Sequence, residues 1–179
     1  MITRIVGLGN DLLSDDAVGL EIARLVRQRL GHRDDIEFRE SPVGGLRVLD
    51  DLLGCDRLVL LDAVVSSRLA PGAIGVWRWD EAAETFVPYD EWGVTLPLDD
   101  VRCLGRRYHS THDTDVASTL GLAKRLGLPV PVSAFLVGVV VREVFEFGLG
   151  LDPAVAVGRD RAAELVVRAL AAERQEATA

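Results

Sequence analysis

Three aspartates are the side chains whose positions best suit metal or proton chemistry. Asp15 and Asp16 follow a glycine-rich turn at residues 7–10, and Asp62 follows the apolar run at residues 58–61. A carboxylate after such a run is costly to bury unless it is paired or used, so Asp62 is a candidate functional group. Asp15 and Asp16, taken alone, are also typical of carboxylates at the start of a helix.

A histidine is expected to join these carboxylates from a distant segment. His112 directly precedes a predicted helix at residues 113–126, which leads into a buried strand at residues 132–141. Since a helix that precedes a parallel strand runs opposite to it, His112 should lie at the edge where the carboxyl ends of the strands meet. Alone, His112 is also typical of a capping or surface histidine, and His109 is a rival ligand three residues earlier.

Two carboxylates and one imidazole together suit a particular group of metals. This donor set favours nickel, zinc or iron over calcium, and it lacks the thiolates that would select copper(I). Three protein ligands leave positions open for a substrate. The helix that starts near Asp16 is expected to favour the ionised form of its carboxylate. We therefore predict a divalent-metal site built from the 15–16 pair, Asp62 and a histidine.

The alternation of strands and helices indicates the scaffold that would gather these residues. Strands are predicted at residues 2–8, 36–39, 57–63, 73–79 and 132–141. Helices are predicted at residues 15–30, 46–53, 113–126 and 152–168, with Ser14 as the N-cap of the first and Pro153 in the first turn of the last. The expected fold is α/β: a three-layer sandwich whose five-stranded, mostly parallel sheet has helices on both faces.

The order of the strands decides whether the predicted site can form. A 2-1-3 order of the first three strands would bring the loops after the first and third strands together. The strand at 73–79 follows its predecessor too closely for a helical crossover, so it should run antiparallel to that strand.

Length and composition limit the classes of protein to consider. The 179 residues fit one domain, with a possible insertion or lid at 80–111 and a frayed tail at 171–179. A net charge of −8 argues against nucleic acid as a partner, and no uninterrupted apolar run is long enough to insert into a membrane. The N-terminal sequence lacks a basic leader, and Cys55 and Cys103 are expected to be reduced thiols, so we expect a cytoplasmic protein.

Several segments together resemble the hydrogenase maturation endopeptidases. Residues 7–19, Gly-Leu-Gly-Asn-Asp-Leu-Leu-Ser-Asp-Asp-Ala-Val-Gly, match that family's opening pattern G-x-G-N-x-L-x-x-D-[ED]-x-x-G. Residues 61–64 with 70–72 resemble its second motif, and residues 137–139 with 148–153 resemble its last strand and helix start. A nucleotide-binding turn would not require Asn10, Leu12 and the paired acids in this register.

The resemblance implies an activity and a role for each residue. Family members remove the C-terminal extension of the large-subunit precursor of nickel-iron hydrogenase after nickel insertion, and they recognise the nickel carried by that substrate. Carried over to this chain, the residues that would contact the nickel are Asp16, Asp62 and His112. The family often has glutamate at the position of Asp16. Asp16 and Asp62 then belong to the catalytic site, with Asp15 as a possible general base or orienting group. Other divalent cations could substitute for nickel at these ligands.

Two other functions use the same residues. A non-catalytic metal-delivery or assembly factor for hydrogenase would need the same three ligands, and a nucleotide- or flavin-binding module could be built on the Gly7–Asn10 turn. The chain has neither a G-x-S-x-G elbow nor an H-E-x-x-H helix, so an acyl-enzyme or resident-zinc protease is not predicted.

Overall fold

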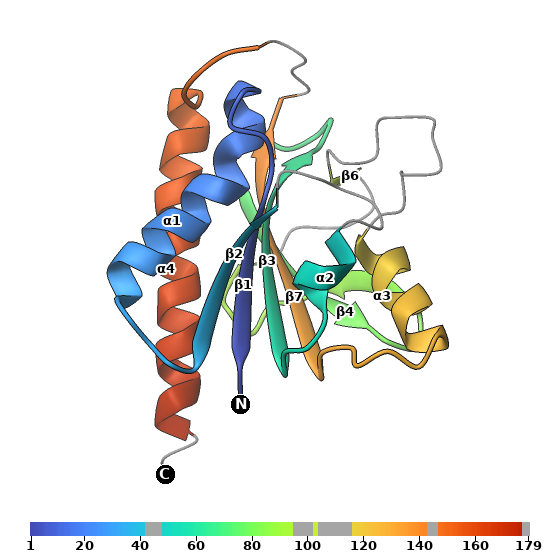
Figure 1. Cartoon of the computed structure of the whole chain (residues 1–179). Helices are drawn as coiled ribbons and strands as arrows, with labels where there is room; N and C mark the ends of the chain where they lie inside the picture. Colours follow the sequence, from blue (N-terminus) through green and yellow to red (C-terminus); the bar gives the residue numbers. More distant parts are fainter. Residues whose placement is uncertain (42–47, 95–101, 104–115, 143–146, 177–179) are drawn as a thin grey trace.

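A mixed β-sheet with helices on both faces forms the molecule (Figure 1). The structure, a computed structural model, describes residues 1–41, 48–94, 102–103, 116–142 and 147–176. The strands are β1 (Thr3–Leu8), β2 (Ile36–Ser41), β3 (Arg57–Val65), β4 (Ile74–Asp80), β5 (Thr85–Pro88), β6 (Arg102–Cys103) and β7 (Ser133–Val141). The helices are η1 (Ser14–Ala17), α1 (Val18–Leu30), α2 (Leu49–Leu52), α3 (Val116–Arg125) and α4 (Pro153–Glu176).

The sheet confirms the predicted order of the first strands and is larger than predicted. Its strands follow the order β2-β1-β3-β7-β4-β5, and the two-residue β6 pairs with β3 outside this order. The five strands predicted from the sequence are therefore too few, because β5 and β6 were not foreseen. β5 has only one buried side chain, that of Phe86, so its sequence shows little of the apolar alternation that identifies a strand.

Strand directions follow from the connections between the elements. β1, β2, β3 and β7 are mutually parallel neighbours, joined by crossovers that contain helices. β4 runs antiparallel to these strands, as predicted, but it pairs with β7 and not with β3. β5 returns antiparallel to β4 as its hairpin partner. Part of the predicted 80–111 insertion therefore extends the sheet.

Two apolar layers attach the helices to the sheet. On one face, α1 and α4 pack against odd-numbered residues of β3, such as Val59 and Leu61. On the other face, α2 and α3 pack against even-numbered residues of β3, such as Leu58 and Leu60. The alternation of side chains along a strand produces this division, and Figure 1 shows the two pairs of helices on opposite sides of the sheet. The predicted three-layer arrangement is confirmed.

The structure corrects the predicted start of the first helix and the predicted end of the last helix. Ser14 is not the N-cap of a continuous helix: it begins the 3₁₀ turn η1 with a positive φ of 42°, and α1 starts only at Val18. α4 continues to Glu176 although fraying was expected from residue 171. The segment 171–176 consists of alanine, glutamate, arginine and glutamine, all of which favour helix. No helix in the described part of the chain is both long and apolar enough to cross a membrane.

Candidate functional site

The turn that follows β1 is organised by Asn10. Its side-chain oxygen accepts a hydrogen bond from the amide of Leu12 at 3.0 Å, and its carbonyl accepts one from the amide of Leu13 at 3.0 Å. The carbonyl of Leu13 then accepts the amide of Asp16 at 2.9 Å. An asparagine is suited to this position because its side chain imitates a backbone turn. These bonds lead the chain from the carboxyl end of β1 into η1, which carries Asp15 and Asp16.

Two glycines bring this turn and α1 against the strand ends. A Cβ atom on Gly9, whose φ is +140°, would overlap the carbonyl oxygen of Asp16. A Cβ atom on Gly19 would overlap the carbonyl oxygens of Leu8 and Leu61. The start of α1 therefore rests directly on the end of β1 and on Leu61 within β3, the residue that precedes Asp62. η1 and β3 accordingly approach with Cα atoms within 8 Å of each other.

Asp16 lies in a half-buried position at this edge. Burial raises the pKa of its carboxyl group above the ordinary value, and a hydrogen bond from the backbone amide of Asn10 opposes the rise. The sequence predicted that the helix start would favour the ionised form. That prediction is wrong in direction, because the desolvation of the carboxylate outweighs the hydrogen bond. An approaching cation would reverse the balance by favouring the charged form.

Asp62 comes from the neighbouring strand and is 7% exposed. The sequence placed it at the end of a strand, whereas β3 continues three residues further to Val65. Pairing between β1 and β3 nevertheless stops at Gly7 and Leu61, so Asp62 is the first residue of β3 beyond the end of β1 in that ladder. It lies opposite Gly138 of β7, and its Oδ1 accepts the amide of Ala63 at 2.8 Å. η1 and β3 are therefore neighbours in the backbone arrangement, and a shared site for the 15–16 pair and Asp62 stays a prediction.

Asp15 is placed differently from Asp16. Its side chain is 6% exposed, and its Oδ1 accepts a hydrogen bond of 2.7 Å from the backbone amide of Asp152, just before α4. Asp152 in turn caps α4, because its own Oδ1 accepts the amide of Ala154 at 2.8 Å. One carboxylate of the predicted set is therefore bonded to the protein backbone 137 residues away.

The two predicted histidine ligands lie outside the described residues. Both His112 and His109 fall in the range 104–115, so the structure does not test either of them as a ligand. Among the residues that the structure describes, no group of three or more histidine, cysteine, aspartate or glutamate side chains could hold a metal ion. The described residues supply two acidic positions to the site, and a third ligand would have to come from elsewhere in the chain or from a substrate.

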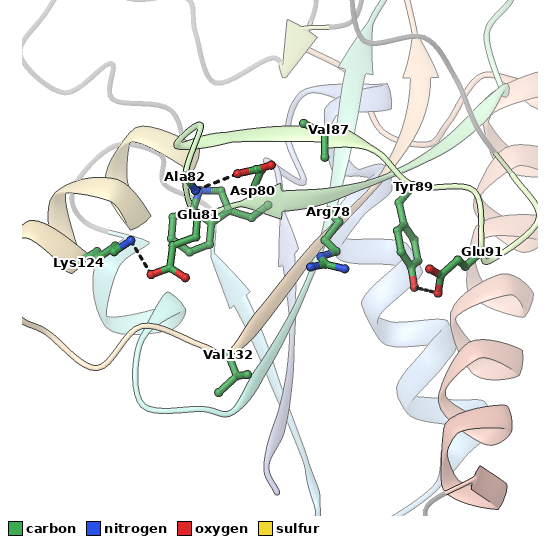
Figure 2. Close-up of a pocket in the computed structure, with 10 residues that line it drawn as sticks. Arg78, Asp80, Glu81, Ala82, Val87, Tyr89, Glu91, Lys124 and Val132 are labelled. Carbon is green, nitrogen blue, oxygen red and sulfur yellow. Dashed lines mark hydrogen bonds and ion pairs between the residues drawn. The ribbon is translucent and has the colours of Figure 1, made fainter.

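A pocket of about 600 Å³ lies away from these acids (Figure 2). It is formed near the end of β4 and beside α3, and none of the predicted site residues lines it. Its charged groups are largely paired: Lys124 contacts Glu81 at 2.5 Å, and the hydroxyl of Tyr89 donates to Glu91 at 2.5 Å. Burial, with a contribution from Glu91, raises the pKa of Tyr89 to about 12.

Sequence reasoning missed the two residues that support the acids. The roles of Asn10 as a donor to Asp16 and of Asp152 as a donor to Asp15 were not predicted. A signal for the second was present in the sequence. Because α4 follows the parallel strand β7, its Asp-Pro start had to lie at the same sheet edge as the first motif.

Comparison with known proteins places the chain among similar sequences and structures. No family model matches it. It is 30% identical over 166 residues to the hydrogenase 2 maturation protease of Escherichia coli strain K12, which covers 93% of this chain and 88% of that protein. It is 29% identical over 175 residues to the hydrogenase expression/formation protein HoxM of Azotobacter vinelandii, covering 93% of this chain and 75% of that protein.

Solved structures of related proteins have the same fold. The hydrogenase maturating endopeptidase HybD from Escherichia coli superposes with a TM-score of 0.72 at 29% identity, covering 97% of this chain and 94% of that one. The NiFe hydrogenase maturation protease HybD from Thermococcus kodakarensis gives a TM-score of 0.61 at 23% identity, covering 94% of this chain and 98% of that one. The second likeness bears on the fold alone.

Proposed function

The chain belongs to the hydrogenase maturation proteases, and we propose that it removes a C-terminal extension from the large-subunit precursor of a nickel-iron hydrogenase after nickel insertion. As a member of this family it is a peptide-bond hydrolase. The nickel is a feature of the substrate in this proposal: it marks the precursor as ready to be cut. Asp16, Asp62 and His112 are the residues proposed to contact it.

The observation that carries the proposal is the convergence of two acidic segments at one sheet edge. Gly19 holds the start of α1 against Leu8 and Leu61, and η1, which contains Asp16, has Cα atoms within 8 Å of β3, the strand that contains Asp62. Asp16 follows β1 and Asp62 lies in β3, so the two residues are 46 positions apart in sequence. Open α/β sheets bind their ligands at this edge.

The state of Asp16 suits the recognition of a cation. Burial raises the pKa of Asp16, which makes its ionised form less favourable than it would be in water. A metal ion carried by the precursor would stabilise the carboxylate and compensate for its desolvation. A precursor without nickel would bind without this stabilisation of the Asp16 carboxylate. This difference provides a physical basis for selecting the nickel-loaded form.

The family membership favours a protease over the two other functions considered. A metal-delivery factor would share the ligands, but the similar proteins with assigned activities are a protease and an endopeptidase. A nucleotide module would need space at the Gly7–Asn10 turn for a phosphate group. Gly9 is instead packed against the backbone of Asp16.

A direct test compares purified precursor with and without nickel. We expect the wild-type protein to shorten only the nickel-loaded precursor, as measured by intact-mass spectrometry. Asp16→Ala and Asp62→Ala should each abolish this shortening while retaining a folded circular-dichroism spectrum. Asp11→Ala is the matched control, because Asp11 is an exposed acid in the same turn that pairs with Arg24. Equal cleavage of both precursors would contradict recognition of nickel.

A further inference from the structure

The turn that carries Asp16 is joined to the segment before α4 by main-chain pairing. Leu13 and Gly148 form a parallel bridge, in which the amide of Gly148 donates to the carbonyl of Leu12 at 3.1 Å. The amide of Ser14 donates to the carbonyl of Gly148 at 3.0 Å. These two segments are more than 130 residues apart in sequence, so this pairing fixes the first motif to a remote part of the fold.

Asp15 adds a side-chain bond to this connection. Its Oδ1 accepts the amide of Asp152 at 2.7 Å, and the carboxylate is almost fully buried. A buried carboxylate is stable only when its oxygens find donors, and a helix start adds favourable electrostatics. α4, which begins at the next residue, is 24 residues long and packs along α1 and β7. Asp15 is therefore attached to the start of a helix that packs against both α1 and β7.

A general base needs a carboxylate oxygen that reaches a water molecule in the site. One oxygen of Asp15 is already bonded to the protein backbone, in a residue with 6% exposure. Asp16, by contrast, is half-buried and directly follows Asp15 in the same 3₁₀ turn. Any rotation of this turn that breaks the bond to Asp152 would also move Asp16.

On the basis of the function proposed above, we infer that Asp15 is a positioning residue that holds Asp16 in place for the precursor's nickel and does not take a proton from water. The bond to Asp152 ties the turn to the start of α4, while Asn10 and Gly9 tie it to the end of β1. A ligand held in this way loses little conformational freedom when the metal arrives.

The substitutions Asp15→Asn and Asp15→Ala separate positioning from proton transfer. Asparagine keeps a carbonyl oxygen that accepts the Asp152 amide but cannot act as a base, whereas alanine removes both capacities. For positioning, Asp15→Asn should keep kcat for nickel-loaded precursor within about threefold of wild type. Asp15→Ala should raise KM and weaken binding of nickel ion alone, measured by calorimetry, by about tenfold or more, as the loss of a charge-assisted hydrogen bond implies.

The outcomes distinguish this inference from the proposed function. If wild-type protein fails to process nickel-loaded precursor, the proposed function is wrong, whatever the variants do. If wild-type protein is active and Asp15→Asn is as inactive in kcat as Asp15→Ala, with unchanged nickel binding, Asp15 is a base and the positioning role is overturned. Wild-type behaviour of Asp15→Ala would also overturn it.

A control at the same helix start tests whether stability alone explains the result. Asp152→Ala removes the side-chain cap on Ala154 but leaves the backbone amide that Asp15 binds. It should lower the melting temperature, as loss of a cap does, and leave KM for the precursor close to wild type. If Asp152→Ala raised KM as much as Asp15→Ala does, any weakening of the start of α4 would be enough to impair precursor binding. That result would overturn the specific role of Asp15.

Discussion

Gly9 lies so close to the carbonyl oxygen of Asp16 that no side-chain carbon fits between them. Its φ of +140° is also a conformation that residues with a Cβ atom rarely adopt. The two residues are seven positions apart and are brought together by the turn at Asn10. This contact seats the turn that carries Asp16 on the end of β1, so its disruption should affect both folding and the proposed function.

Gly9→Ala is therefore expected to destabilise the protein by more than about 3 kcal/mol, since backbone strain and steric overlap add. Urea unfolding followed by circular dichroism measures the change. Gly31→Ala is the matched control: Gly31 also has a positive φ, of +66°, but nothing lies within 4 Å of a Cβ atom there. It should cost only about 1 to 3 kcal/mol, from backbone strain alone. Similar losses in both variants would show that the contact with Asp16 is unimportant.

Gly19→Ala should also destabilise the protein, although alanine normally favours a helix over glycine by about 1 kcal/mol. The reason is that a Cβ atom at Gly19 would overlap backbone oxygens of Leu8 and Leu61, which cannot move without separating α1 from the sheet. In Gly121→Ala the new Cβ would meet only the end of the Glu84 side chain at 2.8 Å. That variant in α3 should be neutral or slightly more stable, as judged by melting temperature. A stabilised Gly19→Ala would contradict the tight seating of α1.

Asp16→Asn should stabilise the metal-free protein at neutral pH. The folded-state pKa of Asp16 is raised, so ionising this group costs stability as the pH rises through that pKa. Asparagine removes this cost but keeps an oxygen for the Asn10 amide. The gain should shrink on acidification and vanish below about pH 3.9, where the carboxyl group is protonated in both states. Free energies of unfolding from urea titrations at several pH values check this.

Asp11→Asn provides a control of opposite sign. Its hydrogen bond and charge interaction with Arg24 lower the pKa of Asp11, so its ionised form contributes stability above its ordinary pKa. Substitution should produce a small loss at neutral pH that disappears as the pH falls. If Asp16→Asn also lost stability at neutral pH, burial would not be the dominant influence on Asp16.

His112→Ala should abolish processing of nickel-loaded precursor, and His109→Ala should leave it largely intact. The expectation rests on the position of His112 directly before the α3 region in the sequence motif. Denaturing gel electrophoresis of the precursor before and after incubation measures the cleavage. Circular dichroism confirms that each variant folds. The reverse pattern would assign the ligand to His109. Full activity in both variants would contradict a histidine contact with the metal.

Short-range signals in the sequence were enough to predict most of the helices and strands and the sheet edge at which the acids lie. The apolar runs in β1, β3 and β7, the turn at residues 7–10 and the Asp-Pro start of α4 are short-range signals, because they depend on side-chain alternation and turn chemistry. Together with the crossover rule, they predicted that the 15–16 pair and Asp62 approach the same edge. The family motif then indicated which residues take part.

Only the tertiary structure decided how these residues are held. The placement of β4 beside β7, the bond from Asp152 to Asp15 and the pKa shift of Asp16 all depend on contacts between distant segments. Desolvation is a property of the packed surroundings, so a helix-start argument gave the wrong sign for Asp16. The sequence therefore identified the acids, while three-dimensional packing left Asp16 half-buried and bonded Asp15 to the start of α4.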